Sequence, residues 1–253
     1  MIPKIIHLCW LSGDPYPENI RRCIDSMYEK LPDYEIKIWT KENFDLNSVQ
    51  WVKEAFDAKK YADAADYIRF WALYNYGGIY LDSDVEVLRS FDSFLHHKSF
   101  TGFEYINIPE AAVMGGEAGV LWIKRCLDWF SGKSFYAKDR TMTRQVVPHL
   151  VKLAIEAQYN TIINDKEKII DLGDLVIYPH SYFSPKNYFT EKVELKPESV
   201  CIHRFAKSWS PPPKRFVTTC IHRLMICLFG KQFHDKLFRF VMPFPKTFNG
   251  DPV

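Results

Sequence analysis

Residues 77–84 read Gly-Gly-Ile-Tyr-Leu-Asp-Ser-Asp, a short apolar run that ends in two aspartates. The two glycines permit a tight reversal of the chain, and the apolar run predicts a buried strand that leads directly into Asp82 and Asp84. In open α/β sheets, ligands bind at the carboxyl ends of strands. Two carboxylates placed there repel each other unless a cation lies between them. The tripeptide alone is also common in solvated turns, so it leaves both interpretations open.

Strand and helix patterns alternate on both sides of this stretch. Short apolar or period-two runs predict strands at 4–10, 34–39, 79–81, 99–104, 168–178 and 199–205. Amphipathic runs predict helices at 17–30, 48–60, 62–75, 117–131 and 143–158. This alternation is typical of an α/β fold with a mostly parallel central sheet. Pro211-Pro212-Pro213 predicts a stiff extended spacer, so we expect a body at 1–212 and a tail at 213–253.

Composition and charge narrow the class of protein. Of the 253 residues, 47% are hydrophobic and 25% are charged, which is ordinary for a globular protein and argues against disorder. The net charge of +2 is uneven, because residues 207–246 hold eight Lys or Arg and one acid. That segment carries +7 and the rest of the chain −5. A basic tail favours an anionic partner, either a membrane surface or nucleic acid; we expect a membrane and no nucleic acid.

The cysteines and the first residues bear on the compartment. The six cysteines form no C-x-x-C pair, and most lie in apolar segments. They therefore predict reduced core residues, not a disulfide framework or a zinc site. The chain begins with a strand pattern and shows no signal-peptide layout. We expect a cytoplasmic protein, peripheral on the inner face of the membrane.

Three further groups of residues offer chemistry. Asp66 and Arg69 lie three apart on one helical face, and from spacing alone a surface ion pair is the favoured interpretation. His203 follows a short strand near the end of the body, and a neutral imidazole there could complete a metal site, with Ser208 and Trp209 donating to a diphosphate. Trp10 ends the first strand, where its ring could stack on a nucleobase, although the position alone favours core packing.

Together these segments resemble glycosyltransferase family 32, which includes capsular-polysaccharide transferases and mannosyltransferases with a DXD-containing sugar-binding region. The resemblance rests on Ile2-Pro3-Lys4-Ile5-Ile6-His7-x-x-Trp10, on Ala65-Asp66-Tyr67-Ile68-Arg69 with Tyr76-Gly77-Gly78-Ile79-Tyr80-Leu81-Asp82-x-Asp84, and on His203 to Trp209. Residues 2–104 match closely in order and spacing, and residues 105–195 only loosely. The last motif departs from the family pattern at Arg204, Phe205 and Lys207, which puts its loop contacts in doubt.

The resemblance implies a fold, a cofactor and roles for the residues. It implies a GT-A type nucleotide-sugar-binding fold, a divalent cation (Mn²⁺ or Mg²⁺) and transfer with retention at the anomeric carbon. Asp84 and His203 would bind the metal, and Asp82 would contact the ribose or metal-bound water. Asp66 and Arg69 would hold the donor sugar. Trp10 would stack on the base, and Ser208 and Trp209 would face the diphosphate.

We therefore expect a metal-dependent retaining hexosyltransferase or N-acetylhexosaminyltransferase. The donor would be a nucleotide sugar, a UDP-sugar before a GDP-sugar, and the acceptor a glycan or lipid-linked glycan in bacterial surface polysaccharide synthesis. Two alternatives stay open. The run before Asp82 also fits the nucleophile loop of an aspartate-dependent phosphohydrolase, but the only candidate for its later acidic pair, Gly173-Asp174, lacks a second well-placed aspartate. A non-catalytic module that binds nucleotide sugars is the other.

The tail suggests a separate hypothesis. Between 214 and 242, apolar residues at helical spacing alternate with Arg215, Arg223, Lys231 and other basic residues. A basic amphipathic helix suits an anionic membrane surface, where a lipid-linked acceptor would lie. A helix packed on the body with a solvated basic face explains the pattern equally well.

Overall fold

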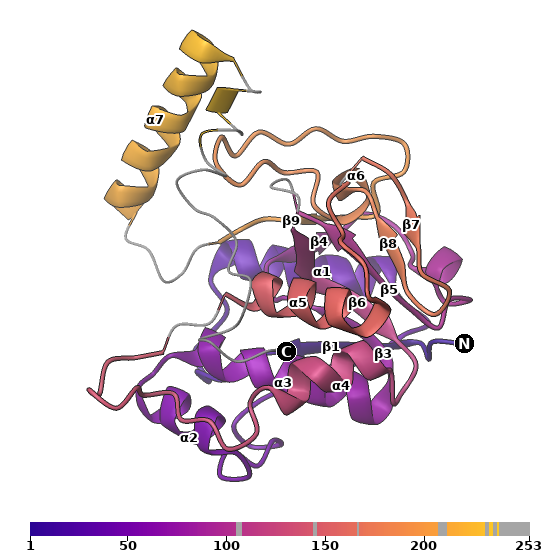
Figure 1. Ribbon diagram of the computed structural model, residues 1–253, viewed down its shortest axis with the longest axis vertical. Helices are drawn as coiled ribbons and strands as arrows, with labels where there is room; N and C mark the ends of the chain where they lie inside the picture. Colours follow the sequence, from indigo (N-terminus) through magenta and orange to yellow (C-terminus); the bar gives the residue numbers. More distant parts are fainter. Residues whose placement is uncertain are drawn as a thin grey trace.

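The computed structural model describes residues 1–104, 108–143, 146–165, 167–206, 212–230, 233–234 and 237. Within these ranges a seven-stranded sheet, in the order β2-β1-β3-β6-β5-β8-β7, is flanked by helices (Figure 1). Its strands are β1 (Ile5–Cys9), β2 (Glu35–Trp39), β3 (Gly78–Leu81), β5 (Ser99–Phe103), β6 (Pro109–Gly116), β7 (Ile170–Asp171) and β8 (Val176–Tyr178). Strands β4 (Val85–Val87) and β9 (Cys201–His203) form a separate two-stranded sheet.

The central sheet is mixed but mostly parallel. β1 runs parallel to β2 and β3, and β5 runs parallel to β8. β6 lies antiparallel between β3 and β5, and β7 lies antiparallel at the edge beside β8. Five of the seven strands therefore point the same way, which confirms the predicted α/β class with a mostly parallel sheet.

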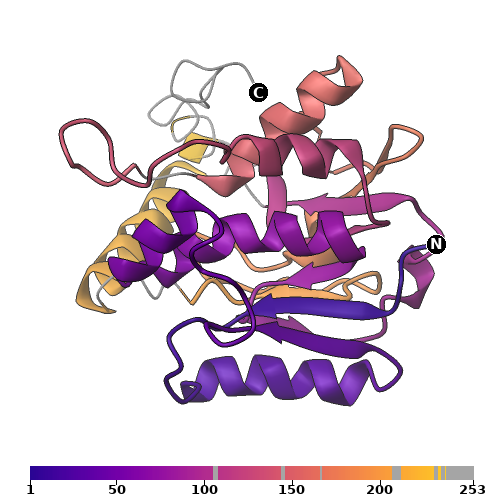
Figure 2. The same ribbon diagram turned by 90° about the horizontal axis from the view of Figure 1, so that it is seen from below.

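Helices cover both faces of this sheet. The described helices are α1 (Glu18–Lys30), α2 (Gln50–Asp57), α3 (Tyr61–Tyr76), α4 (Leu121–Asp128), α5 (Val147–Tyr159), the short α6 (His180–Phe183) and α7 (Pro212–Phe229), with a 3₁₀ turn η1 (Asp92–Phe94); α7 stands apart from the sheet. Figure 2 shows α1 on one side of the strands and α3 on the other. In the described part of the chain, none of these helices combines the length and the apolar composition that a membrane crossing needs.

Alternation along β3 decides which way its side chains point. Ile79 and Leu81 pack into the hydrophobic core on the α1 side, whereas Tyr80 packs into the core formed with α2 to α5. Successive strand residues point to opposite faces. Tyr80 therefore points to the same face of the sheet as α3, the helix that precedes β3 in the chain.

The two glycines before β3 make the tight connection from α3. Gly77 ends α3 with φ +66°, and Gly78 follows with φ +110°, both in the left-handed region that side chains avoid. A Cβ atom on Gly78 would lie 2.6 Å from the carbonyl oxygen of Ile5. Glycine is thus required for β3 to pass close beside β1, as the predicted chain reversal implied.

Three features differ from the sequence predictions. The predicted strand 168–178 is a hairpin, because Gly173 turns the chain (φ +87°) between β7 and β8. Pro212 and Pro213 do not lie in an extended spacer: they begin α7, since proline is tolerated in a first helical turn. Four cysteines are buried as predicted, but Cys220 and Cys227 are exposed on α7.

Candidate active site

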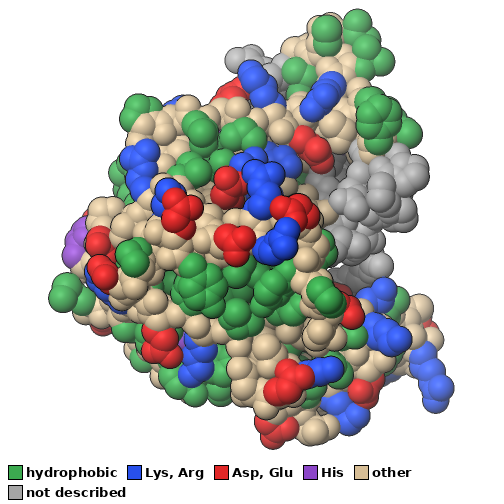
Figure 3. All heavy atoms as spheres, turned by 180° about the vertical axis from the view of Figure 1, so that it is seen from behind, with side chains coloured by type: hydrophobic (Ala, Val, Ile, Leu, Met, Phe, Trp, Pro, Cys, Tyr) green, Lys and Arg blue, Asp and Glu red, His purple; other side chains and the backbone are tan. Residues whose placement is uncertain are grey.

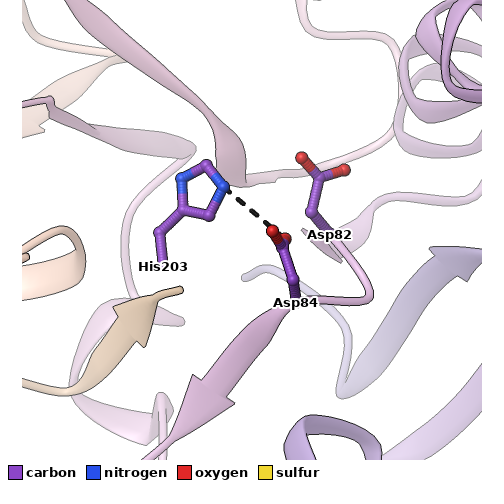
Figure 4. Close-up of side chains that lie close together, drawn as sticks. All are labelled: Asp82, Asp84 and His203. Carbon is purple, nitrogen blue, oxygen red and sulfur yellow. Dashed lines mark ion pairs between the residues drawn. The ribbon is translucent and has the colours of Figure 1, made fainter. Parts of the chain in front are cut away.

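Asp82 and Asp84 lie in the turn that joins the large sheet to the small one. Asp82 follows the last residue of β3, and its backbone N–H still donates to the carbonyl of Ala112 on β6 (2.9 Å). Asp84 precedes β4, which pairs antiparallel with β9 so that Val85 lies opposite His203. This pairing brings two residues that are far apart in the sequence side by side, as Figure 4 shows for Asp84 and His203.

The three side chains form a cluster. One ligand atom from each of Asp82, Asp84 and His203 lies within 4.8 Å of the others, and Nε2 of His203 is 3.5 Å from Oδ1 of Asp84. The other oxygen of Asp84, Oδ2, accepts a hydrogen bond from the backbone N–H of Ala206 (2.7 Å). The backbone of Ala206 therefore fixes one oxygen of Asp84, while the other oxygen faces His203.

Glu110 on β6 completes the surroundings of His203, and the sequence analysis missed it. Its Oε1 lies 3.3 Å from Nδ1 of His203 and accepts the N–H of Ala112 (3.0 Å). Its Oε2 accepts the hydroxyl of Ser184. A carboxylate on one imidazole nitrogen orients the ring and leaves the other nitrogen for a metal. Here, that other nitrogen faces Asp84.

Opposite charges stabilise His203 beside the carboxylates of Glu110 and Asp84. Burial lowers the pKa of His203, but the carboxylates of Glu110 and Asp84 outweigh it and raise that pKa to about 10. Burial raises the pKa of Glu110, and the charge of His203 with the two hydrogen bonds brings it below its usual value. Without a metal, the imidazolium thus balances the surrounding carboxylates.

A second carboxylate, Glu104, lies on the β6 side of the cluster. Its oxygen, one from Glu110 and one nitrogen of His203 also lie within 4.8 Å of one another. Burial, with the adjacent charge of Glu110, raises the pKa of Glu104 well above its ordinary value.

Asp82 has different neighbours. Its Oδ1 accepts the hydroxyl of Tyr80 (2.8 Å) and lies 3.5 Å from Nη1 of Arg69. The guanidinium of Arg69 donates to the carbonyl of Ala111 (3.0 Å) and pairs with the carboxylate of Asp66 (2.8 Å). It also lies 5.0 Å from the centre of the Tyr80 ring. Burial raises the pKa of the Asp82 carboxyl, and Arg69 opposes that rise.

The surface interpretation of the Asp66–Arg69 pair is wrong, because both residues are buried. Three apart on α3, they face the sheet, and the helix carries them to the end of β3. Burial raises the pKa of Asp66, with Arg69 in opposition. The pair lies beside Asp82, and the predicted contact of both residues with a donor sugar stays a prediction.

The remaining predicted residues are Trp10, Ser208 and Trp209. Trp10 lies just after β1, where its ring packs edge-on against Tyr16 and its indole N–H donates to the carbonyl of Asp14 (2.7 Å). Within the described ranges, no hydrogen bond, ion pair or ring contact joins Trp10 to the aspartates or His203. Ser208 and Trp209 lie outside the described residues. The Gly173-Asp174 motif of the phosphohydrolase alternative lies beside β8, separated from β3 by β6 and β5.

Part of the chain around these residues is similar to a known protein family. Residues 17–101 match the family described as "Glycosyltransferase sugar-binding region containing DXD motif". Residues 17–101 are thus similar to the DXD sugar-binding region of glycosyltransferases. This region contains Asp66, Arg69, Asp82 and Asp84, and it confirms the resemblance predicted from the sequence; Glu110 and His203 lie beyond it.

Curated relatives and solved structures show where the similarity extends. "Inositol phosphoceramide mannosyltransferase 3" of Schizosaccharomyces pombe is 38% identical over 103 residues, 39% of this chain and 29% of the relative. "Mannosyl phosphorylinositol ceramide synthase CSH1" of Saccharomyces cerevisiae is 28% identical over 198 residues, 73% of this chain and 51% of the relative. The matches thus span between about a quarter and a half of these relatives. "PaToxG Glycosyltransferase" superposes with TM-score 0.49 and 18% identity over 63% of this chain and 70% of that chain.

Proposed function

We propose that this chain is a metal-dependent glycosyltransferase that moves a hexosyl unit from a nucleotide sugar to a hydroxyl of a lipid-borne acceptor. The observation that carries the proposal is the convergence of Asp82, Asp84 and His203 at the end of β3, within a DXD sugar-binding region. The carboxyl end of a strand in an α/β sheet is also where such ligands bind.

The donor atoms fit a divalent cation. Carboxylate oxygens are suitable ligands for both Mg²⁺ and Mn²⁺. Of these two ions, Mn²⁺ is the transition metal and also binds an imidazole nitrogen. The imidazolium of His203, flanked by Glu110 and Asp84, already provides positive charge where a cation would be held. A cation held by Asp84, His203 and Asp82 would stabilise the negative charge that grows on the departing nucleoside diphosphate.

The chain's own residues supply the positioning. The N–H of Ala206 holds Asp84, and Glu110 orients His203, so both ligands are fixed before any substrate arrives. Arg69 and Tyr80 hold Asp82 in the same way from the other side. Because these partners already hold the ligands in place, the site needs little reorganisation when charge develops on the departing diphosphate.

The identity of the sugar and the acceptor is part of the proposal. The relatives are named as mannosyltransferases acting on inositol phosphoceramide, which favours a mannosyl unit and a lipid acceptor with a polar head. The predicted preference for a UDP-sugar, the retention of configuration and a role in bacterial surface polysaccharide synthesis remain predictions.

A donor panel tests the proposal. The chain would be incubated with UDP- and GDP-linked hexoses and N-acetylhexosamines plus Mn²⁺, and release of nucleoside diphosphate measured with and without a chelator. We expect slow hydrolysis of one donor, stopped by chelation. Asp84→Ala should lower the rate by about a thousandfold because it removes a fixed metal ligand, while Asp57→Ala, at an exposed ion pair on α2, should retain it.

Other outcomes would contradict the proposal. Donor binding without turnover of any sugar would identify a binding module. Release of phosphate from simple phosphoesters would identify a phosphohydrolase. Full activity of Asp84→Ala would show that the chemistry lies elsewhere.

A further inference from the structure

Helix α7 presents an unusual surface for a helix at the outside of a protein. Successive residues of an α-helix are about 100° apart around its axis. Positions 216, 217, 220, 221, 224, 227 and 228 of α7 therefore all fall within one arc of about 140°. Five large apolar side chains in this arc are between 53% and 72% exposed: Phe216, Val217, Ile221, Leu224 and Leu228. The exposed Cys220 and Cys227 lie between them. We call these seven residues the apolar stripe.

Residues outside this arc connect α7 to the body. Thr219 is buried, and the ring centre of His222 lies 4.6 Å from that of Phe189 on the body. The guanidinium of Arg223 donates twice to the carbonyl of Thr190 (2.9 and 2.7 Å). The side of α7 that carries the apolar stripe is therefore directed away from the body. Figure 1 shows α7 standing at the end of the molecule, and Figure 3 shows hydrophobic side chains gathered at that end.

Charge selects among the surfaces that could cover this stripe. Residues 212–229 contain no Asp or Glu, and residues 207–246 carry a net charge of +7. A second copy of the chain would bring two such segments together, and their like charges would repel. An anionic bilayer attracts basic residues near its surface and accepts an apolar helix face at the boundary between headgroups and acyl chains.

We propose that α7 docks this protein on an anionic membrane surface, with the apolar stripe entering the headgroup–acyl boundary and the helix lying in the membrane plane. A helix that lies flat needs apolar residues on one side only, which agrees with the absence of a membrane-crossing helix in the described ranges. Docking does not depend on the proposed transferase activity. If both hold, α7, which follows soon after His203 in the chain, would bring the site to the surface where a lipid acceptor lies.

Vesicle binding of two matched leucine variants tests the proposal. Leu224, in the stripe, and Leu195, in a loop of the body, are 58% and 57% exposed. The full chain, Leu224→Asp and Leu195→Asp would be floated with phosphatidylcholine vesicles that contain phosphatidylserine, and with pure phosphatidylcholine vesicles. We expect binding to the anionic vesicles, weakened about tenfold or more by Leu224→Asp and unchanged by Leu195→Asp. No binding by the full chain, or equal binding by both variants, would overturn the proposal.

The cysteines of the stripe provide an independent readout. Cys220 and Cys227 are exposed and the other four cysteines are buried, so a polarity-sensitive thiol probe will label α7 selectively in the folded protein. Anionic vesicles should shift its emission to the blue, and lipid-bound quenchers should reduce it. A blue shift that grows with protein concentration in the absence of vesicles would show that a second copy covers the stripe, which would overturn the proposal. Either result can be read even if no donor is ever turned over.

Discussion

The two aspartates of the DXD motif are two residues apart in sequence, but they belong to different halves of the site. Asp82 follows a strand of the large sheet and faces Arg69, a cation that the fold itself supplies. Asp84 precedes a strand of the small sheet and faces His203, whose charge depends on a proton. A guanidinium is always charged, whereas an imidazolium can lose its proton to solvent and then bind a metal through the freed nitrogen.

The two sides of the site therefore have different roles, one in stability and one in metal binding. The Asp82 side is a permanent ion network that joins α3 to β3 and β6, so its loss should damage the fold. The Asp84 side exchanges a proton for a cation, so its loss should damage metal binding while the fold persists. The following variants separate the two sides.

The largest expected effect is on stability, at the Asp82 side. Arg69→Met would leave the buried Asp66 and the half-buried Asp82 without their cation. Breaking a buried ion pair in this way costs about 3–5 kcal/mol in the free energy of unfolding, measurable by denaturant unfolding. Lys53→Met, which breaks the exposed pair with Asp57 on α2, should leave stability nearly unchanged because exposed pairs contribute little. Equal stability of the two variants would contradict a structural role for Arg69.

The next effect is on metal affinity, at the Asp84 side. Glu110→Ala removes the carboxylate that orients His203, and loss of such a partner typically lowers metal affinity about 10- to 100-fold. Glu110→Gln keeps the shape and should lose less, and Ser184→Ala, which removes only the hydroxyl that holds Glu110, should lose least. Mn²⁺ binding followed by electron paramagnetic resonance gives all three affinities, with circular dichroism to confirm folding. Unchanged Mn²⁺ affinity in Glu110→Ala would show that Glu110 only fills space.

Local patterns in the sequence predicted much of the fold. The strand before Asp82, the helix that carries Asp66 and Arg69, and the glycine stop between them all have short-range signals, and the structure confirms them. Strand β6 was missed because Pro109, Glu110 and the glycines at its end are unfavourable in strands. Its position between β3 and β5 makes it a strand, and that information comes from its neighbours.

The missed strand explains the missed residue. Glu110 reaches His203 only because β6 lies beside β3 and because β9 pairs with β4, both of which are long-range events. Similarly, spacing alone could not show that the Asp66–Arg69 pair faces the sheet. The sequence offered His203 as a candidate metal ligand, but neither its position nor the family's motif reveals the carboxylate of Glu110 beside it.

The most direct test of the account is the pH dependence of Mn²⁺ affinity in the wild type and in His203→Ala. The pKa of His203 in the metal-free site is raised to about 10, so below that pH a bound cation must displace a proton. Wild-type affinity should therefore rise by about tenfold for each pH unit between about pH 6 and pH 8. His203→Ala should bind Mn²⁺ more weakly and should lose this pH dependence. The same affinity and the same slope in both proteins would contradict the assignment of His203 and Asp84 as the metal site.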